Sequence, residues 1–310
     1  MKKLFFIGWI MSLSSFAFGQ QIPQFSHYSL NYFGINPAVA GSKPCLDLKL
    51  GYRQQWTGVD DGPRSAFANM HGKIGKGKFN FMGLGGRVET DNTGPLSYTA
   101  LDLAFAYHMR VTRKSMFSAG MALGFHQWRL DAGAISLPET GFFEDPVLGD
   151  AQAKFLFPTV DFGLWWYRED RFVGLSVVNI AELQVKDVGN DTYVNRHFLL
   201  TAGRISEMGD GFFFKPSTNI RMVPGSRPSI DVTAMVDYKE KISLGIGARN
   251  GYGLIGLLKI DAFKYVTIGY AYDMSLSKMR FAGMHTHEIV LGIQACAKGD
   301  SRGIPCAAYD

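Results

Sequence analysis

The sequence predicts an all-β fold: a transmembrane outer-membrane β-barrel of about 14 antiparallel strands, preceded by a non-strand N-terminal segment. Three observations indicate this class. The 310-residue chain opens with a secretory signal, holds no later apolar run of about 18 residues, and is 46% hydrophobic and 14% aromatic but only 19% charged. Soluble domains carry about 25% charge. Since only helices and closed barrels satisfy every backbone polar group in lipid, the composition favours a barrel.

The first 19 residues form the predicted signal peptide. Lys2 and Lys3 precede an apolar stretch at 4–10, and Ala17 and Gly19 supply the small residues of a cleavage site. The apolar part is too short to cross about 30 Å of hydrocarbon as a membrane anchor, so export is expected. Removal of the two lysines lowers the net charge from +5 to +3, which is too small to favour nucleic acid as a partner.

The segment 20–45 is expected to lie outside the strand pattern. It is rich in Gln, Asn, Ser and aromatic residues and contains Pro23, Pro37 and Pro44, which interrupt β-ladders. Two placements remain open at this point: a plug inserted in the barrel lumen, or a segment at the periplasmic mouth.

The region 46–296 is the predicted barrel, because it alternates apolar with small or polar residues as a wall with a lipid face and a lumen face requires. Ile242, Leu244 and Ile246, for example, alternate with Ser243 and Gly245. The fourteen predicted strands cover 46–56, 64–74, 79–89, 96–109, 115–130, 156–168, 171–180, 195–206, 211–223, 228–238, 241–249, 252–261, 264–274 and 286–296. An even number of strands closes an antiparallel barrel and leaves no edge.

The predicted connections alternate between two kinds. One set is short and mostly charged: 75–78, 110–114, 169–170, 207–210, 239–240 and 262–263. The other set includes the longer connections 131–155, 181–194 and 275–285. Outer-membrane barrels have short turns in the periplasm and long loops outside. The pattern therefore predicts that both chain termini, including the polar tail 297–310, lie in the periplasm.

Tryptophan and tyrosine residues gather near the ends of the predicted strands. Examples are Trp56, Trp128, Trp165, Trp166 and Tyr167. These side chains prefer the interfaces between hydrocarbon and water, so they are expected to mark the two membrane surfaces.

The sequence contains three cysteines, Cys45, Cys296 and Cys306. An exported protein is permitted a disulfide, and an odd count leaves at least one thiol over. A bond between Cys296 and Cys306, which are closest in sequence, and three cysteines without any disulfide are both open.

No motif points to catalysis. His285, His287 and Glu288 have a loose spacing for a metal site, and strand alternation separates Glu288 from the two histidines. The glycine-rich stretch 83–86 lies within a strand without a following helix, which excludes a phosphate loop. No Ser-His-Asp or Cys-His arrangement emerges. We therefore expect a protein that is not an enzyme, with no catalytic residue, no cofactor and no metal.

Charged residues occupy several strand positions opposite the apolar face. The candidate lumen network consists of Arg53, Arg87, Asp161, Arg221, Asp231, Asp273 and Glu288. A charge facing lipid costs ~2–4 kcal/mol at mid-depth, so these side chains are expected to face the lumen. They can line a pore, or they can pair into a network that fills the lumen together with the N-terminal segment. We favour the second role.

Several stretches resemble the type IX secretion system membrane proteins of the PorP/SprF family of Bacteroidota. QIPQFSHY at 21–28 is similar to the family's DPQFSQY opening, INPAVAG at 35–41 to its LNPAYAG, and YRQQW at 52–56 to its YRNQW. RHF at 196–198, KPS at 215–217, GYAYD at 269–273 and HEI at 287–289 also resemble the family. Two departures are Ile22, where the family often has Asp, and the cysteine-bearing tail.

The resemblance implies an outer-membrane component of type IX protein secretion, which supports export, surface anchoring or gliding adhesin display. The partners it implies are secreted proteins or adhesins with C-terminal sorting domains, and periplasmic and outer-membrane components of the system; membrane lipid surrounds the barrel. Recognition is expected on the long connections, with Phe142, Phe143 and Met279 as candidate contacts. The alternative is an outer-membrane channel or transporter for a small solute, which a lumen clear of the N-terminal segment favours.

Overall fold

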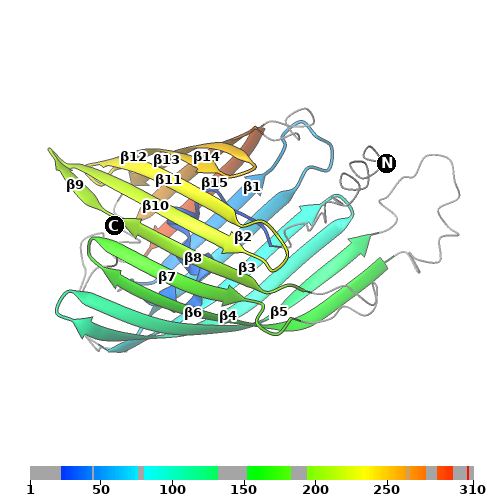
Figure 1. The fold of residues 1–310 in the computed structure, drawn as a ribbon, viewed down its shortest axis with the longest axis horizontal. Helices are drawn as coiled ribbons and strands as arrows, with labels where there is room; N and C mark the ends of the chain where they lie inside the picture. Colours follow the sequence, from blue (N-terminus) through cyan, green and yellow to red (C-terminus); the bar gives the residue numbers. More distant parts are fainter. Residues whose placement is uncertain are drawn as a thin grey trace, which may run out of the picture.

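The protein is a closed antiparallel β-barrel (Figure 1). The computed structural model describes residues 22–43, 45–75, 80–131, 152–182, 194–263, 265–276, 285–295 and 306. The strands are β1 (Asp47–Gln54), β2 (Arg64–Ile74), β3 (Phe81–Thr93), β4 (Leu96–Thr112), β5 (Ser115–Asp131), β6 (Gln152–Arg168), β7 (Arg171–Val178), β8 (His197–Arg204), β9 (Ser206–Gly209), β10 (Phe212–Met222), β11 (Ser229–Tyr238), β12 (Ile242–Arg249), β13 (Gly253–Ala262), β14 (Val266–Ser275) and β15 (His285–Gln294).

The barrel closes where β15 pairs with β1, and each remaining strand pairs with its neighbours in sequence. Strands β8 and β9 both pair with β10, along different parts of its length, and only Ile205 separates them. They therefore act as one interrupted strand, and the wall has 14 strands, which confirms the predicted number.

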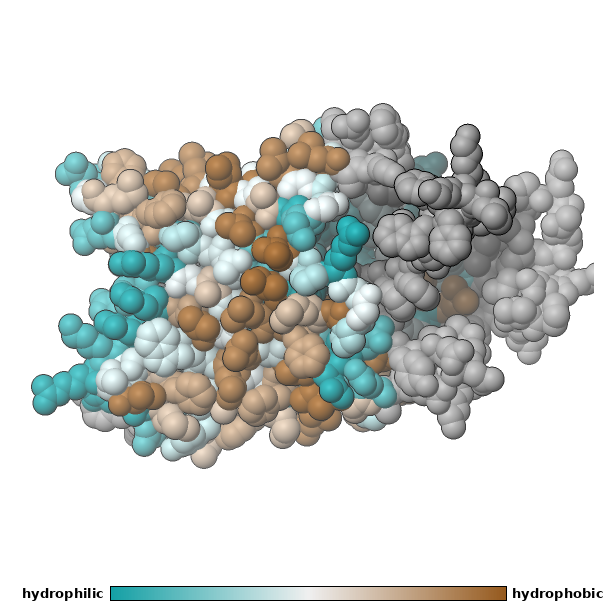
Figure 2. All heavy atoms as spheres, in the orientation of Figure 1, coloured by the Kyte–Doolittle hydropathy of each residue, from teal (hydrophilic) through white to brown (hydrophobic). Residues whose placement is uncertain are grey.

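The wall alternates between a lipid face and a lumen face. On β4, Leu101 and Leu103 are 54% and 70% exposed, whereas Ala100, Asp102 and Ala104 between and beside them are buried. Hydrophobic side chains cover the middle of the visible wall, and hydrophilic ones gather at its left end (Figure 2). The strand periodicity read from the sequence therefore separates the two faces correctly.

The two ends of the barrel differ in their connections. At one end, called the turn side here, the connections are 75–80, 113–114, 169–170, 210–211, 239–241 and 263–265. At the other end, the loop side, they are 55–63, 94–95, 132–151, 179–196, 223–228, 250–252 and 276–284. The chain enters the wall at Asp47 and leaves it at Gln294, both on the turn side. One loop-side connection is shorter than expected, because β3 continues to Thr93.

The N-terminal segment 22–43 lies inside the barrel. It contains three short helices, η1 (Tyr28–Leu30), α2 (Tyr32–Ile35) and η2 (Pro37–Val39). None of the helices among the described residues has the length and hydropathy to cross a membrane. The segment starts in the loop-side half, where the Pro23 carbonyl accepts from Arg221 near the end of β10. It ends in the turn-side half, where Lys43 pairs with Asp47.

The aromatic side chains near strand ends do not all face lipid. Trp165 and Tyr167 on β6 are fully buried and pack with Tyr32 and Phe33 of the N-terminal segment. The interpretation of these two as interface residues was therefore wrong. The physical reason is strand parity: odd positions at the turn-side end of β6 face inward, where α2 supplies aromatic partners.

Both cysteine alternatives were also wrong. Cys45, just before β1, is disulfide-bonded, whereas Cys306 is a buried thiol outside any disulfide. Barrel closure brings the two ends of the chain together, since the Leu46 carbonyl accepts a hydrogen bond from the Ala295 N–H (2.9 Å). Closeness in sequence therefore does not select the disulfide. Cys306 joins the buried cluster that contains Tyr32 and Tyr167, so this position of the tail lies inside the barrel.

Candidate functional site: the plug and the lumen wall

The segment 22–43, which we call the plug, keeps its shape through local caps. The Asn31 side chain accepts from the Gly34 N–H (3.2 Å) at the start of α2. The Asn36 side chain accepts from the Ala38 N–H (2.9 Å), and Pro37 occupies the first position of η2. Asparagine is a preferred N-cap and proline a preferred first helical residue. The INPAVAG stretch at 35–41 therefore contains the residues that start and cap its own short helix.

Glycines in the wall let the plug backbone lie directly against the strands. A Cβ atom at Gly83 of β3 would lie 1.9 Å from the Ala40 carbonyl oxygen, and one at Gly120 of β5 would lie 2.6 Å from the Ala38 Cα. Gly41 has a φ of +77° and packs on Gly83. Gly83 and Gly120, which we call the glycine track, thus let the plug backbone pack directly against the wall. The glycine-rich stretch of β3 is therefore not a phosphate loop.

Hydroxyl and imidazole groups of the wall then satisfy the plug's carbonyl groups. Ser118 of β5 donates to the Ala38 carbonyl (2.7 Å), and Ser176 of β7 donates to the Ile35 carbonyl (2.7 Å). His108 Nε2 of β4 donates to the Ala40 carbonyl (2.7 Å). Because a buried backbone carbonyl without a partner is costly, these bonds make the lumen wall a fitted receptor for the plug.

The plug's polar end docks on a carboxylate of the last strand. Glu288 of β15 accepts hydrogen bonds from the backbone N–H groups of Ser26 (2.7 Å) and His27 (2.9 Å). Arg53 of β1 donates to the same carboxylate (2.9 Å) and to Asp273 of β14 (2.6 Å). The Ser26 hydroxyl donates to Asp273 (2.6 Å). All five residues are buried, so strong charge-assisted bonds hold the plug here.

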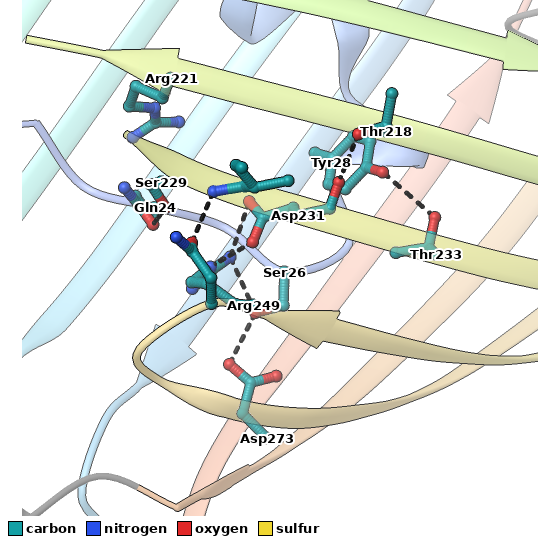
Figure 3. A network of polar contacts seen from close by, with 12 residues as sticks. Gln24, Ser26, Tyr28, Thr218, Arg221, Ser229, Asp231, Thr233, Arg249 and Asp273 are labelled. Carbon is teal, nitrogen blue, oxygen red and sulfur yellow. Dashed lines mark hydrogen bonds and ion pairs between the residues drawn. The ribbon is translucent and has the colours of Figure 1, made fainter. Parts of the chain in front are cut away.

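A second arginine extends this network across the barrel (Figure 3). Arg249 of β12 pairs with Asp231 of β11 and reaches the Ser26 hydroxyl at 3.5 Å. The Tyr28 hydroxyl lies 3.1 Å from both Ser217 of β10 and Thr233 of β11. The plug residues 24–28 therefore touch strands from β10 round to β1.

A separate cluster lies on strands β3, β4 and β6. Arg87 of β3 bonds Asp161 of β6 (2.6 Å) and Asp102 of β4 (3.2 Å), and donates to the Gly34 carbonyl of the plug (3.2 Å). Arg221 donates to the plug at Pro23. The seven network residues expected from the sequence are thus all buried on the lumen side, in two clusters that the plug connects.

The two histidines of the last strand lie on its other face from Glu288. His287 is hydrogen-bonded to the Tyr270 hydroxyl (2.7 Å), and His285 to the Tyr272 hydroxyl. Among the described residues, no group of three His, Cys, Asp or Glu side chains is placed to hold a metal ion. The candidate partner contacts Phe142, Phe143 and Met279 lie outside the described residues.

Sequence reasoning missed several lumen residues. Asp102 and His126 complete the Arg87 cluster, and their strand parity, opposite Leu101 and Phe125, was a signal that could have found them. Four inward lysines on the turn side were also missed: Lys43, Lys49, Lys215 and Lys259. The parity rule identifies the three on strands, whereas Lys43 lies on the plug, where no periodicity applies.

Burial changes the ionisation of plug side chains. His27 is fully enclosed, and burial lowers its pKa to about 4, so the imidazole is neutral near pH 7. Burial, together with the neighbouring Lys49 ammonium, lowers the pKa of Lys43 to about 7. The lowered pKa of His27 leads us to expect weaker docking of the plug at acidic pH.

Two cavities lined by described residues flank the plug, one towards each end of the barrel. The loop-side cavity has a volume of about 60 Å³ and touches Pro23, Phe25 and Arg221. The turn-side cavity has a volume of about 70 Å³ and touches Tyr32, Lys43 and Lys49. Neither runs the length of the barrel, because the plug residues between them line both.

Comparison with solved structures supports the fold. The structure is similar to the TodX deltaS2S3 mutant monoaromatic hydrocarbon channel, with a TM-score of 0.51 and 11% identity over 85% of this chain and 93% of that one. It is also similar to the P. putida toluene transporter TodX, with a TM-score of 0.51 and 10% identity over 88% and 94% of the two chains. These identities show a shared barrel fold alone.

Comparison with curated protein sequences finds no match. The family model described as type IX secretion system membrane protein PorP/SprF matches residues 17–293, which include the plug and every strand of the wall except the last residue of β15. This match confirms the resemblance seen in the separate stretches. The chain belongs to the type IX secretion system membrane protein PorP/SprF family, whose pattern here encodes an outer-membrane barrel with a docked plug.

Proposed function

We propose that this protein supports export, surface anchoring or gliding adhesin display of secreted proteins as a plugged outer-membrane barrel, without enzymatic activity. One observation carries the proposal. The family-like stretches 21–28, 52–56, 269–273 and 287–289, far apart in sequence, meet around Ser26 and bind the plug to the wall. A family pattern that specifies plug docking fits a rigid scaffold better than an open pore.

The turn side faces the periplasm in this proposal, and the loop side faces the cell exterior. This orientation places short turns in the periplasm, as outer-membrane barrels do. Secreted proteins with type IX sorting domains then meet the long loop-side connections, where Phe142, Phe143 and Met279 are candidate contacts. Periplasmic components of the system meet the turn side, where the chain enters and leaves the wall.

Crosslinking and affinity purification from native outer membranes test the proposal, combined with conductance of the purified barrel in planar bilayers. The expected result is recovery of secreted or periplasmic type IX proteins and no conductance. Recovery of neither class of protein, together with solute-dependent conductance, contradicts the proposal and favours the channel alternative. The Gly83→Ala variant is the conductance control, because it weakens plug docking without altering the lipid face.

A further inference from the structure

Three arginines stand side by side on the outer face of the wall at its turn side. Arg168 ends β6, Arg171 begins β7 and Arg204 ends β8. Tyr167 and Phe172, the sequence neighbours of the first two arginines, are buried on the lumen side. Since successive side chains of a strand point to opposite faces, Arg168 and Arg171 point outward. Arg204 pairs directly with Arg171 and shares its face.

The three arginines outnumber the carboxylates that pair with them. Asp170, in the turn between β6 and β7, lies 2.6 Å from Arg171 and 3.5 Å from Arg168. Within the part of the chain that the structure describes, neither Arg204 nor the exposed Glu169 of the same turn makes an ion pair. Like charges directly opposite each other destabilise a sheet, as Arg171 and Arg204 are here. A further anion at this face would relieve the repulsion.

The neighbouring turn adds two more cations. Arg113 and Lys114 connect β4 to β5, and both are exposed. Lys114 precedes Ser115, which pairs with Arg168, so this turn lies beside the three arginines. Hydrophilic side chains gather at this end of the wall, on the left of Figure 2. The set that we call the basic patch is Arg113, Lys114, Arg168, Arg171 and Arg204. Its five cations face the two carboxylates of the 169–170 turn, which leaves an excess of positive charge.

The basic patch borders the apolar band of the wall. The next outward positions on β6 and β7 are Trp166 and Val173, which pair directly with each other. Val173 and Leu175 are 43% and 52% exposed, as other lipid-facing side chains of this wall are. Tryptophan prefers the boundary between hydrocarbon and headgroups. A strand advances ~3.3 Å per residue, so the arginines lie roughly 7 Å from this row, at the depth of lipid headgroups.

We propose that the basic patch binds the phosphate of an anionic membrane phospholipid from the leaflet at the turn side. The phosphate accepts hydrogen bonds from the guanidinium groups of Arg171 and Arg204, and the acyl chains lie on Trp166, Val173 and Leu175. A planar guanidinium offers a phosphate two parallel N–H donors. The excess positive charge favours an anionic lipid over a zwitterionic one, and the apolar row favours a lipid over a free anion. The inference requires only a barrel in a membrane and goes beyond the proposed function.

Native mass spectrometry of the purified barrel in detergent tests the proposal, with phosphatidylglycerol and phosphatidylcholine of identical acyl chains at equal concentration. The unaltered barrel should retain phosphatidylglycerol preferentially. Arg204→Gln should lower that preference about fivefold, because a basic residue near a membrane surface contributes about this factor. Lys241→Gln is the matched control, since it removes an exposed turn-side cation from the turn between β11 and β12, away from the basic patch. It should leave the preference unchanged.

Equal retention of the two lipids by the unaltered barrel contradicts the site, and so does an equal effect of Arg204→Gln and Lys241→Gln. Displacement of phosphatidylglycerol by inorganic phosphate at equal concentration contradicts a lipid as the occupant. Arg171→Gln is a second variant that should lower the preference by a similar factor. If Arg171→Gln fails to fold because Asp170 loses its partner, Arg204→Gln still decides, since Arg204 is exposed.

Discussion

The glycine track makes a sharp prediction about how the plug is held. Gly83→Ala adds a Cβ that would lie 1.9 Å from the Ala40 carbonyl oxygen and 2.8 Å from the Gly41 Cα. Both contacts are backbone, so the plug must retreat by about 1 Å before the first contact reaches 3.0 Å. That shift breaks the bond between His108 and the Ala40 carbonyl.

The free-energy cost follows from these contacts. Overpacking a fitted interior costs ~1–3 kcal/mol, and an unsatisfied buried carbonyl adds ~1–3 kcal/mol. We expect plug docking over 36–43 to weaken by about 2–6 kcal/mol, a change of roughly 30-fold or more in the population of the undocked state. The wall strands keep their own ladders, so the barrel itself should stay folded.

Hydrogen exchange measured by mass spectrometry on peptides that cover 36–43 gives the assay, because amide exchange reports local opening. Gly86→Ala is the matched control: it lies on the same strand with its nearest contact at 3.7 Å, on the lipid face. Gly83→Ala should accelerate exchange over 36–43, and Gly86→Ala should not. Equal protection in the two variants refutes the glycine track as the reason for docking.

Three further predictions concern the charges and the lipid face. Glu288→Gln removes the carboxylate shared by Arg53 and two plug amides, so docking at Ser26 and His27 should weaken by ~3 kcal/mol; unchanged amide protection there, relative to the exposed Glu207→Gln control, contradicts this. The folded pKa of His27 is lowered to about 4 from 6.5, so the unfolded state binds more protons between these values. Plug stability should therefore fall as pH drops from about 6.5 to about 4, by at most ~3 kcal/mol; His27→Gln should remove that part of the pH dependence, and an identical pH profile for exchange of residues 26–28 in this variant contradicts the assignment. Leu103→Arg places a charge in the lipid-facing wall and should lower the free energy of unfolding in vesicles by ~2–4 kcal/mol; a stability equal to that of Leu103→Gln argues against a lipid-facing position.

The wall was predictable because its signal is local. Successive strand positions alternate between the lipid face and the lumen face, and a run such as 64–74 shows that period without help from distant residues. The limits of β2 were predicted to the residue, and those of the other strands differ by a few positions. The prediction of a turn at 207–210 was wrong, because Ser206–Gly209 form strand β9, which pairs with β10 after an interruption at Ile205. This strand is polar and exposed, so it lacks the apolar alternation that identified the other strands.

The sequence predicted a segment outside the strands, but it did not decide whether this segment lies in the lumen or at the periplasmic mouth. Its residues have no period, and each contact joins it to a strand far along the chain: Ser26 meets Glu288, and Ala38 lies against Gly120. Such pairings depend on barrel closure and register, which a local pattern does not contain. The same reason explains why Trp165 and the cysteine pairing were misinterpreted.

The ion pairs of Arg53 do not depend on the plug. Arg53 joins Asp273 and Glu288 directly (2.6 and 2.9 Å), which links β1, β14 and β15 without any plug atom. Arg53 already balances part of the negative charge of these two carboxylates. The plug adds hydrogen bonds from two backbone N–H groups and one hydroxyl. A buried ion pair with one partner removed is strongly destabilising, yet departure of the plug removes none of these charges. Hydrogen bonds from plug donors to the carboxylates of Glu288 and Asp273 therefore fix where the plug docks. The ion pairs of Arg53 with these two carboxylates remain in the wall when the plug leaves. We infer that docking is specific and the barrel is self-supporting, so Ser26→Ala should loosen the plug without lowering barrel stability, whereas Arg53→Met should lower both.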